Sequence, residues 1–231
     1  MVTQMMHFYK EWQKMPLRSM VCLMHAGKQI LSFWFFFLFS ILSEASPLIF
    51  IDPGHGGKNY GTYSSDRKYR EKDLALTTSL FLKEILQSRG YRVLLSRQKD
   101  HFLSLEKRVV LSNRSSAQIF VSVHYNSAPS VEAKGIEVFY YKRGTYKKRT
   151  RSRRLASFVE KKMIRRTKTF SRGVKTANFF VIRNVNIPAI LVEGGFMTNQ
   201  WEMNRLKEKK YLYLIAQGIA DGIDLYFGRS Q

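Results

Sequence analysis

Short apolar runs alternate with longer amphipathic segments along the chain after residue 47. The apolar or β-branched runs predict six strands, at Leu48–Ile51, Tyr91–Leu95, Ile119–Val123, Ile136–Tyr141, Phe179–Ile182 and Ala189–Val192. Most of these runs are continuously apolar, which is typical of strands that helices cover on both faces of a sheet. The pattern therefore predicts a single-domain α/β fold with about six strands.

Amphipathic segments between and after these runs predict five helices. Lys72–Arg89 places Leu74, Phe81 and Ile85 on one face, and it stops at Gly90, a residue suited to the left-handed conformation at a helix end. The other four predicted helices are Leu105–Ser115, Arg153–Arg166, Gln200–Leu206 and Lys209–Tyr226. This alternation of strands and helices is that of α/β units.

The N-terminal 45 residues have a different pattern, and they are set apart from the fold. Ile30–Leu42 is a 13-residue apolar run that follows basic residues. Such a run is shorter than the roughly 20 residues of a membrane-spanning helix and is typical of a signal peptide. Small residues at Ser43 and Ala45 predict cleavage between Ala45 and Ser46, which leaves residues 46–231 as the single folded domain. Two alternatives stay open: a start at Met20 or Met24, and a leader that remains attached as an anchor.

Charge and composition narrow the class of protein. The chain has 39 Lys and Arg against 17 Asp and Glu, and residues 46–231 keep 35 and 15 of these, a net charge of +20. Hydrophobic residues make up 45% of the chain, enough for a core, so disorder over the whole length is excluded. The single cysteine, Cys22, excludes a disulfide scaffold and a cysteine-rich zinc fold. We expect an exported protein of the periplasm or cell envelope, and a monomer.

Three ionisable residues follow the ends of separate predicted strands: His55, His124 and Glu193. Ligands of open α/β sheets bind at this carboxyl edge, where the loops converge. Glu71 precedes the helix that begins near Lys72 and can turn back onto the same edge. Two imidazoles and one carboxylate are a catalytic zinc set, and a second carboxylate can act as general base. The residues alone therefore indicate a mononuclear metallohydrolase.

Each of these residues also has a purely structural interpretation. His55 lies in a glycine-rich tight turn, and His124 ends an apolar run where a hydrogen-bonded core histidine is equally reasonable. Glu71 lies among charged residues and is suited to a solvated or helix-capping role. Glu193 fits such a role least, because a carboxylate after a buried strand is costly unless it is paired or bound to a cation. A further histidine, His101, lies in a polar connection and is expected at the surface.

Together these segments resemble a known family, the zinc-dependent N-acetylmuramoyl-L-alanine amidases of the cell-wall type, or amidase-3 family. The resemblance covers most of Ile49 to Tyr226. Six motifs occur in the family's order: Ile51–Gly57 (IDPGHGG), Glu71–Leu76 (EKDLAL), Arg108 within Leu105–Asn113, Ser122–Ser127 (SVHYNS), Gly135–Tyr140 (GIEVFY) and Pro188–Phe196 (PAILVEGGF). Six ordered motifs are a specific signal.

The resemblance implies a mixed sheet, one zinc ion per chain held by His55, Glu71 and His124, and Glu193 as the catalytic residue. It implies that the substrate is peptidoglycan or its muropeptides, cleaved at the amide between N-acetylmuramic acid and the L-alanine of the stem peptide. In such a mechanism zinc activates water, and Glu193 takes a proton from the water and passes it to the leaving amine.

About ten residues, Lys142–Arg151, separate the predicted strand ending at Tyr141 from the next predicted helix. Some family members carry a long insertion here, with a helix that blocks the active site until a partner removes it; the short connection indicates that this insertion is absent. Six of the eight residues in Lys147–Arg154 are basic. This run is either a solvated loop and helix start or a surface for salt-sensitive contact with an anionic membrane or acidic wall material.

Two other function classes were weighed against the amidase. A basic nucleic-acid-binding protein explains the charge but neither the leader nor the strand-edge residues, so we expect no nucleic-acid partner. A serine-dependent D,D-carboxypeptidase is suggested by Ser104 and Lys107, a Ser-x-x-Lys pattern, together with Lys175–Ala177, which departs from Lys-Thr-Gly by one residue. Ser104 is equally suited to cap the helix that follows it.

Overall fold

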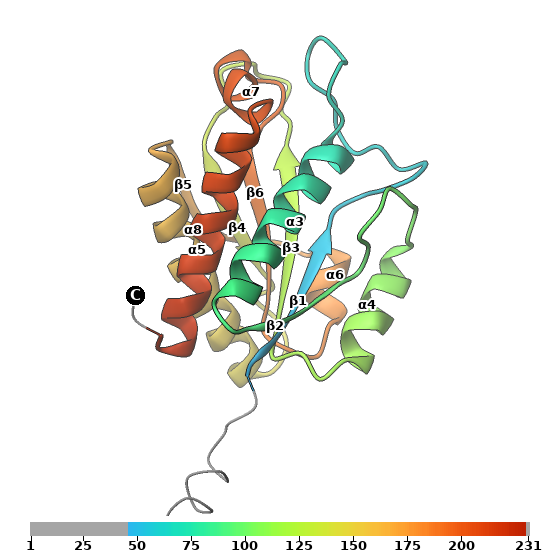
Figure 1. Ribbon diagram of the computed structural model, residues 1–231, viewed down its shortest axis with the longest axis vertical. Coiled ribbons are helices and arrows are strands. Elements are labelled where there is room, and N and C mark those ends of the chain that lie inside the picture. The colour runs from blue at the N-terminus through green and yellow to red at the C-terminus, as the bar shows by residue number, and fades with distance from the viewer. Residues whose placement is uncertain (1–45, 230–231) are drawn as a thin grey trace, which may run out of the picture. The chain divides into compact units, whose positions relative to one another are not determined.

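The structure is a computed structural model that describes residues 46–229 (Figure 1), and the predicted leader with its cleavage point lies outside the described residues. Six strands of this part form one sheet: β1 (Leu48–Pro53), β2 (Arg92–Leu95), β3 (Ile119–Asn126), β4 (Ile136–Tyr140), β5 (Ser171–Thr176) and β6 (Ala189–Phe196). Their order is β2-β1-β3-β6-β4-β5. Only the β4–β6 pair is antiparallel, so the sheet is mixed, as expected.

Helices cover both faces of this sheet (Figure 1). Those of the described residues are α3 (Glu71–Ser88), α4 (Leu105–Arg114), α5 (Tyr146–Thr167), α6 (Phe180–Asn184), α7 (Gln200–Leu206) and α8 (Lys209–Phe227). One hydrophobic cluster joins the sheet to α3, α5 and α8, and a smaller one joins it to α4 and α6. The predicted three-layer α/β architecture is confirmed. Gly90 adopts a φ of 77°, the left-handed conformation expected after α3.

Strand β1 shows why the apolar runs are continuous. Ile49 and Ile51 belong to the larger cluster, whereas Leu48 and Phe50 belong to the smaller one. Successive side chains of a strand point to opposite faces, so a strand covered on both sides needs an apolar residue at every position. Burying such a side chain contributes about 1.5–3 kcal/mol, and the central strands are therefore a rigid base for the loops that follow them.

One predicted strand is wrong, and one observed strand was not predicted. Phe179–Ile182 is not a strand, because residues 180–184 form the short helix α6, which buries Val181 and Ile182 in the smaller cluster. A short apolar run is compatible with either structure. The sixth strand is β5, which pairs on one side only, with β4. Its sequence, SRGVKT, is mostly polar because an edge strand buries little of its surface.

The long helix α5 begins seven residues earlier than predicted, at Tyr146 instead of Arg153. Thr145 caps it, because its side chain accepts a hydrogen bond from the backbone N–H of Lys148. Residues 141–145 alone join β4 to α5, which leaves no room for a blocking insertion in this connection. The basic run Lys147–Arg154 is therefore helical and not a solvated loop.

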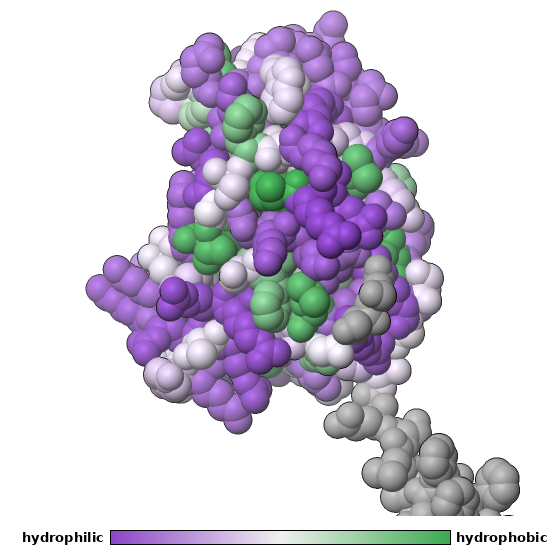
Figure 2. All heavy atoms as spheres, turned by 90° about the vertical axis from the view of Figure 1, so that its left-hand side faces the viewer, coloured by the Kyte–Doolittle hydropathy of each residue, from purple (hydrophilic) through white to green (hydrophobic). Residues whose placement is uncertain are grey.

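The side of the molecule that carries β5 and α5 is predominantly hydrophilic, and its apolar residues lie in small separate patches (Figure 2). Helix α5 alone contributes ten basic residues and one acidic residue. Within residues 46–229, no helix combines the length and the apolar character needed to cross a membrane.

Candidate metal centre and active site

His55 lies two residues beyond β1, at the carboxyl edge of the parallel strands, which is the upper edge of the sheet in Figure 1. Its φ of 57° is a left-handed conformation that non-glycine residues seldom adopt. Two buried guanidinium groups hold this turn. Arg97 Nη2 donates to the carbonyl of Gly54 at 2.6 Å, and Arg108 donates to the carbonyls of Pro53 (2.7 Å) and His55. The strained backbone is fixed by its surroundings.

Asp52 provides the counter-charge for this arrangement. It is 1% exposed, and it accepts from Arg108 Nη1 at 2.7 Å and from the hydroxyls of Ser96 and Ser122. A carboxylate buried so deeply is stable when its charge and its lone pairs are satisfied. Burial, together with the nearby charge of Arg108, lowers the pKa of Arg97 to about 10, so the Arg97 guanidinium stays charged at neutral pH.

Glu71 is the first residue of α3 and lies at the centre of the site. Its Oε1 oxygen lies 2.9 Å from His55 Nε2 and 2.8 Å from His124 Nδ1. The backbone N–H of Thr62 donates to Oε2 at 2.9 Å, and the side chain is buried. The loop after β1 thus returns to the sheet edge and brings the carboxylate between two imidazoles.

His124 and Glu193 lie opposite each other on the neighbouring parallel strands β3 and β6. Both lie within their strands and not, as the apolar runs predict, just past the strand ends. Close packing of the loop around them depends on glycine at two positions. A Cβ at Gly54 would lie 2.5 Å from the His124 ring, and one at Gly61 would lie 2.4 Å from Glu71 Oε2. The site therefore requires small residues where the loop crosses it.

Asn59 fixes the orientation and the tautomer of His55. His55 Nδ1 lies 2.9 Å from Asn59 Oδ1, and the backbone N–H of Gly61 donates to the same atom at 3.2 Å. An atom that accepts from a backbone N–H is the amide oxygen, so His55 Nδ1 carries the proton. Nε2 is then the nitrogen that faces Glu71 and is free to bind a metal.

The two carboxylates of the site have opposite pKa shifts. Burial favours a higher pKa for Glu71, but hydrogen bonds from His124 and His55 hold its pKa far below the usual range. Burial raises the pKa of Glu193 well above the usual range, and the charges of Glu71 and Glu137 add to this effect. Burial lowers the pKa of His55, yet its hydrogen bond to Glu71 raises that pKa overall. The opposite shifts separate the two carboxylates into one suited to remain an ionised ligand, Glu71, and one suited to exchange a proton, Glu193.

The arrangement fits a zinc ion. His55, Glu71 and His124 each offer one ligand atom, and these atoms lie within 4.8 Å of one another. Two imidazoles and a carboxylate are a common zinc set that leaves a coordination position for water. In addition, Glu193 Oε2 is buried and has no hydrogen-bond partner within residues 46–229. An orphaned carboxylate oxygen beside such a set is suited to receive a proton from that water.

Glu137 is a further buried carboxylate that the sequence analysis did not single out. It lies opposite Glu193 in the antiparallel pair β4–β6 and is 4% exposed. It accepts from Arg172 Nε at 3.0 Å, from Lys175 Nζ and from Asn126 Nδ2 at 2.7 Å. The charge of Glu137 contributes to the raised pKa of Glu193. The partners come from β3 and β5, so only the tertiary fold shows this arrangement.

A cleft of about 340 Å³ opens beside the site and is lined by His55 and His124. Phe102 and Leu105, which are 44% and 49% exposed, form part of its wall. Ser104 also lines the cleft, and its hydroxyl accepts from the backbone N–H of Lys107 at 3.2 Å, as a helix cap does. Nothing here supports the serine-dependent alternative or a nucleic-acid partner.

Fold and site together define an α/β protein with a group of residues suited to bind a metal ion at the carboxyl edge of its sheet. A family model described as N-acetylmuramoyl-L-alanine amidase matches residues 49–224. The chain belongs to this amidase family. Among relatives, it is 36% identical over 179 residues to the N-acetylmuramoyl-L-alanine amidase LytC of Bacillus subtilis (strain 168), which spans 78% of this chain and 35% of LytC.

Solved structures agree with this assignment. An N-acetylmuramoyl-L-alanine amidase from Clostridium difficile 630 matches with a TM-score of 0.76 and 36% identity, over 81% of this chain and 100% of that one. The catalytic domain of CwlV from Bacillus (Paenibacillus) polymyxa var. colistinus matches with a TM-score of 0.74 and 34% identity, over 80% and 99%. In both, the aligned part is nearly the whole solved chain. A domain of this extent therefore folds by itself in relatives, and residues 46–229 contain their own core.

The structure brings all four predicted site residues to one edge of the sheet, and it places His101 at the surface, as expected. Several residues that hold the site were not predicted: Asp52, Asn59, Arg97 and Glu137. The signal for Asp52 was present, since it belongs to the first motif and a charge in an apolar context needs a partner. Arg97 follows β2 in a polar stretch and gave no such signal.

Proposed function

We propose that this chain hydrolyses the amide between N-acetylmuramic acid and L-alanine, with zinc held by His55, Glu71 and His124 and with Glu193 as the proton-transfer residue. Membership of the amidase family supports peptidoglycan as the substrate. The observation that carries the proposal is the position of Glu71 Oε1, within 2.9 Å of two imidazole nitrogens and beside the unpaired carboxylate of Glu193.

The reaction adds water across the amide. The oxygen of water bonds to the carbonyl carbon of the lactyl group, the bond from that carbon to the L-alanine nitrogen breaks, and the nitrogen leaves as an amine. Zinc, when bound, supplies a Lewis acid that lowers the pKa of water and polarises a carbonyl. Glu193 takes a proton from the attacking water and returns it to the leaving nitrogen.

The remaining residues of the site position these groups. Asn59 holds the proton on His55 Nδ1, which keeps Nε2 available as a ligand. Arg97 and Arg108 fix the turn that carries His55, because their hydrogen bonds occupy its carbonyls. The apolar wall at Phe102 and Leu105 is suited to the alkyl parts of a muropeptide.

The site of action follows from the same proposal. Cell-wall amidases among the relatives support a protein of the cell envelope. We propose that residues 1–45 direct export to the periplasm or its equivalent, that cleavage follows Ala45, and that residues 46–231 act there, at the septum during cell division among other places. The anchor alternative is kept, because the sequence of the leader is compatible with both.

The experiment that tests the proposal is a mass-spectrometric digest of purified muropeptides by residues 46–231. It is run as prepared, with a zinc chelator, and with zinc restored. We expect stem peptides with a free N-terminal L-alanine, absent with chelator and recovered with zinc.

Loss of only a terminal D-alanine, indifferent to chelation, would contradict the amidase and favour a serine nucleophile at Ser104. If the expected product still forms after complete removal of zinc, the proposed substrate would stand and the proposed role of zinc would be wrong. The two parts of the proposal are thus tested separately.

A further inference from the structure

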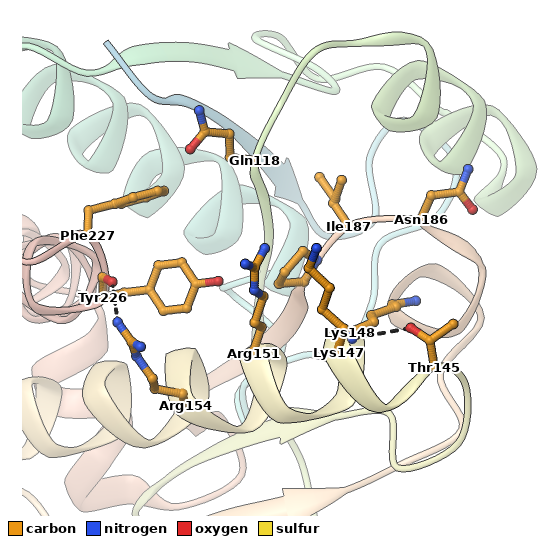
Figure 3. A pocket seen from close by; sticks show the side chains of 11 residues that line it. Gln118, Thr145, Lys147, Lys148, Arg151, Arg154, Asn186, Ile187, Tyr226 and Phe227 are labelled. Atoms are coloured by element: carbon orange, nitrogen blue, oxygen red, sulfur yellow. Dashed lines mark hydrogen bonds between the residues drawn. The ribbon is translucent and has the colours of Figure 1, made fainter. Parts of the chain in front are cut away.

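A cavity of about 640 Å³ lies at the N-terminal end of α5 (Figure 3), and none of the four candidate site residues lines it. Its polar lining is dominated by basic side chains of the first turns of this helix, and no carboxylate lines it. Arg151 and Tyr226 point toward its middle, with Gln118 and Ile187 on the facing wall (Figure 3). A cavity of this size is in the range of small-ligand sites, and its charge selects an anion.

The cations of this cavity lack carboxylate partners. Lys147 and Arg151 form no hydrogen bond or ion pair through their side chains within residues 46–229, and Arg154 donates only to the carbonyl of Tyr226, at 2.8 Å. The three follow one another at four and three residues, so they share one face of α5. Like charges at this spacing, at the positive end of a helix, destabilise the helix. No carboxylate of the cavity lining offsets this destabilisation. A locally unfavourable cluster of this kind is typical of a functional site, so we expect an anion from outside the chain to bind here.

The other end of α5 is different. There Arg166 donates to Asp221 at 2.6 Å, and Arg89 pairs with Asp221 and Asp224. Both ends of the helix are basic, yet within residues 46–229 only the C-terminal end has a cation of the helix, Arg166, in an ion pair with an acid of the same chain. The N-terminal cavity is therefore more than an effect of the overall positive charge.

The cavity lies at the opposite end of the sheet from the catalytic residues. Gln118 and Pro188 line it, and they come just before β3 and β6, the strands that carry His124 and Glu193 near their other ends. His124 lies six positions along the chain from Gln118, which corresponds to about 20 Å of strand. An anion bound here does not meet the reacting groups.

This same end of the sheet receives the chain from residues 1–45. The backbone N–H of Gln118 donates to the carbonyl of Leu48, the first residue of β1, at 2.8 Å. The apolar run of the leader ends at Leu42, so at most about 20 Å of extended chain connects it to β1. While the leader is in a membrane, during export or as an anchor, this end of the domain must be close to the lipid headgroups.

Aromatic residues at this end also favour a membrane. Tyr226 and Phe227 line the cavity, and Tyr146, in the first turn of α5, is 74% exposed. Aromatic side chains beside Lys and Arg are typical of surfaces that lie at the headgroup level. A soluble polyanion would be held by the cations alone and gives no reason for an exposed tyrosine there.

We infer that the cavity formed by Lys147, Arg151 and Arg154 binds the phosphates of anionic phospholipids and docks the domain on the membrane. In this orientation the carboxyl edge of the sheet, with its cleft, faces away from the bilayer and toward the peptidoglycan. The occupant is a membrane with anionic headgroups, such as phosphatidylglycerol.

The test uses residues 46–231 and vesicles of phosphatidylcholine with and without phosphatidylglycerol, at low and high salt. Each cation at such a surface contributes about fivefold in affinity, so K147Q/R151Q/R154Q is expected to bind the anionic vesicles roughly 100-fold more weakly. The matched control is K161Q/K162Q/R165Q, which removes the same charge from the same helix. These positions lie about 15 Å or more along α5 from Arg151, beyond the screening length of about 8–10 Å, so we expect less than about a tenfold loss.

A second variant guards against a folding defect. K147Q/R151Q leaves the hydrogen bond of Arg154 to Tyr226 in place and is expected to lose about 25-fold in vesicle affinity. Turnover of soluble muropeptides should equal that of the unsubstituted domain in every variant, because none of these residues touches the active site.

Equal losses in the cavity variant and the matched control would overturn the proposal in favour of diffuse charge. So would binding to phosphatidylcholine alone, or vesicle binding that none of the substitutions changes. Tighter binding to a soluble glycerol phosphate polymer than to vesicles, at the same phosphate concentration, would assign the cavity to a wall polymer instead of a membrane.

Discussion

The two ends of the sheet differ in whether their charged side chains are paired within the chain. At the carboxyl edge, buried ions are satisfied within the chain: Asp52 by Arg108, and Glu71 by His55 and His124. At the other end, Lys147 and Arg151 have no carboxylate partner among the described residues. Strand β3 runs between the two ends: His124 lies near one end of the strand, and Gln118, which lines the cavity, lies just before the other.

This difference indicates what each end is for. A reacting centre needs its groups at fixed distances, and buried paired charges provide that order at a cost in desolvation. A surface that binds an external anion needs charges that nothing in the chain has neutralised. The exception at the carboxyl edge is the unpaired oxygen of Glu193, and it lies where a proton has to be exchanged.

The largest effect is expected for His124→Ala, which removes one of the three proposed ligands. Turnover should fall to the level of the chelated unsubstituted domain, and the zinc content should fall with it, because two ligands hold zinc poorly. Binding to anionic vesicles should stay unchanged. Zinc analysis, muropeptide digestion and vesicle sedimentation on one preparation check this, and zinc-supported turnover in His124→Ala would break the separation of the two ends.

The next largest effect is expected on the free energy of unfolding, measured with urea for one arginine variant from each end of the sheet. Arg108→Met leaves Asp52 buried without its counter-charge and should lower the free energy of unfolding by about 3–5 kcal/mol. Arg151→Met is the matched change at an exposed, unpaired position and should alter it by no more than about 0.5 kcal/mol. Similar losses in both variants would show that the basic end is also internally paired.

A smaller effect is expected at Asn59, which touches a proposed ligand and not the metal. Asn59→Ala should weaken zinc binding by about 10–100-fold, because His55 loses the acceptor that fixes its tautomer. Asn59→Asp keeps an acceptor oxygen and should restore the affinity. Zinc titration of the three proteins checks this, and equal affinity in all three would remove Asn59 from the positioning of His55.

Much of the fold could be predicted because local pattern and burial agree. Ile49 and Ile51 alternate with Leu48 and Phe50 between two cores, so the strand is apolar throughout and easily recognised. The failures have the opposite cause. Strand β5 has a polar sequence because it lies at an edge, and α6 is too short to show a helical period. The early start of α5 was missed because charge dominates its first two turns.

The four site residues could be selected from the sequence because strand ends and motifs mark them. What could not be predicted is the set of contacts between distant segments. Asn59 and Arg97 act through one or a few hydrogen bonds that depend on how two loops meet. The basic cavity combines residues near 118, 147–154, 187 and 226, and of these only the 147–154 run is visible as a pattern.

Zinc content and muropeptide turnover, measured on the same sample of Glu193→Gln, decide whether the two carboxylates have separate roles. We expect zinc equal to that of the unsubstituted domain, with turnover lower by about 10²–10⁴-fold, because the metal site is intact and the proton acceptor is gone. Near-normal turnover would contradict the role of Glu193. Loss of zinc together with turnover would show that Glu193 belongs to the metal site itself, and the division between ligand and acid–base carboxylates would be wrong.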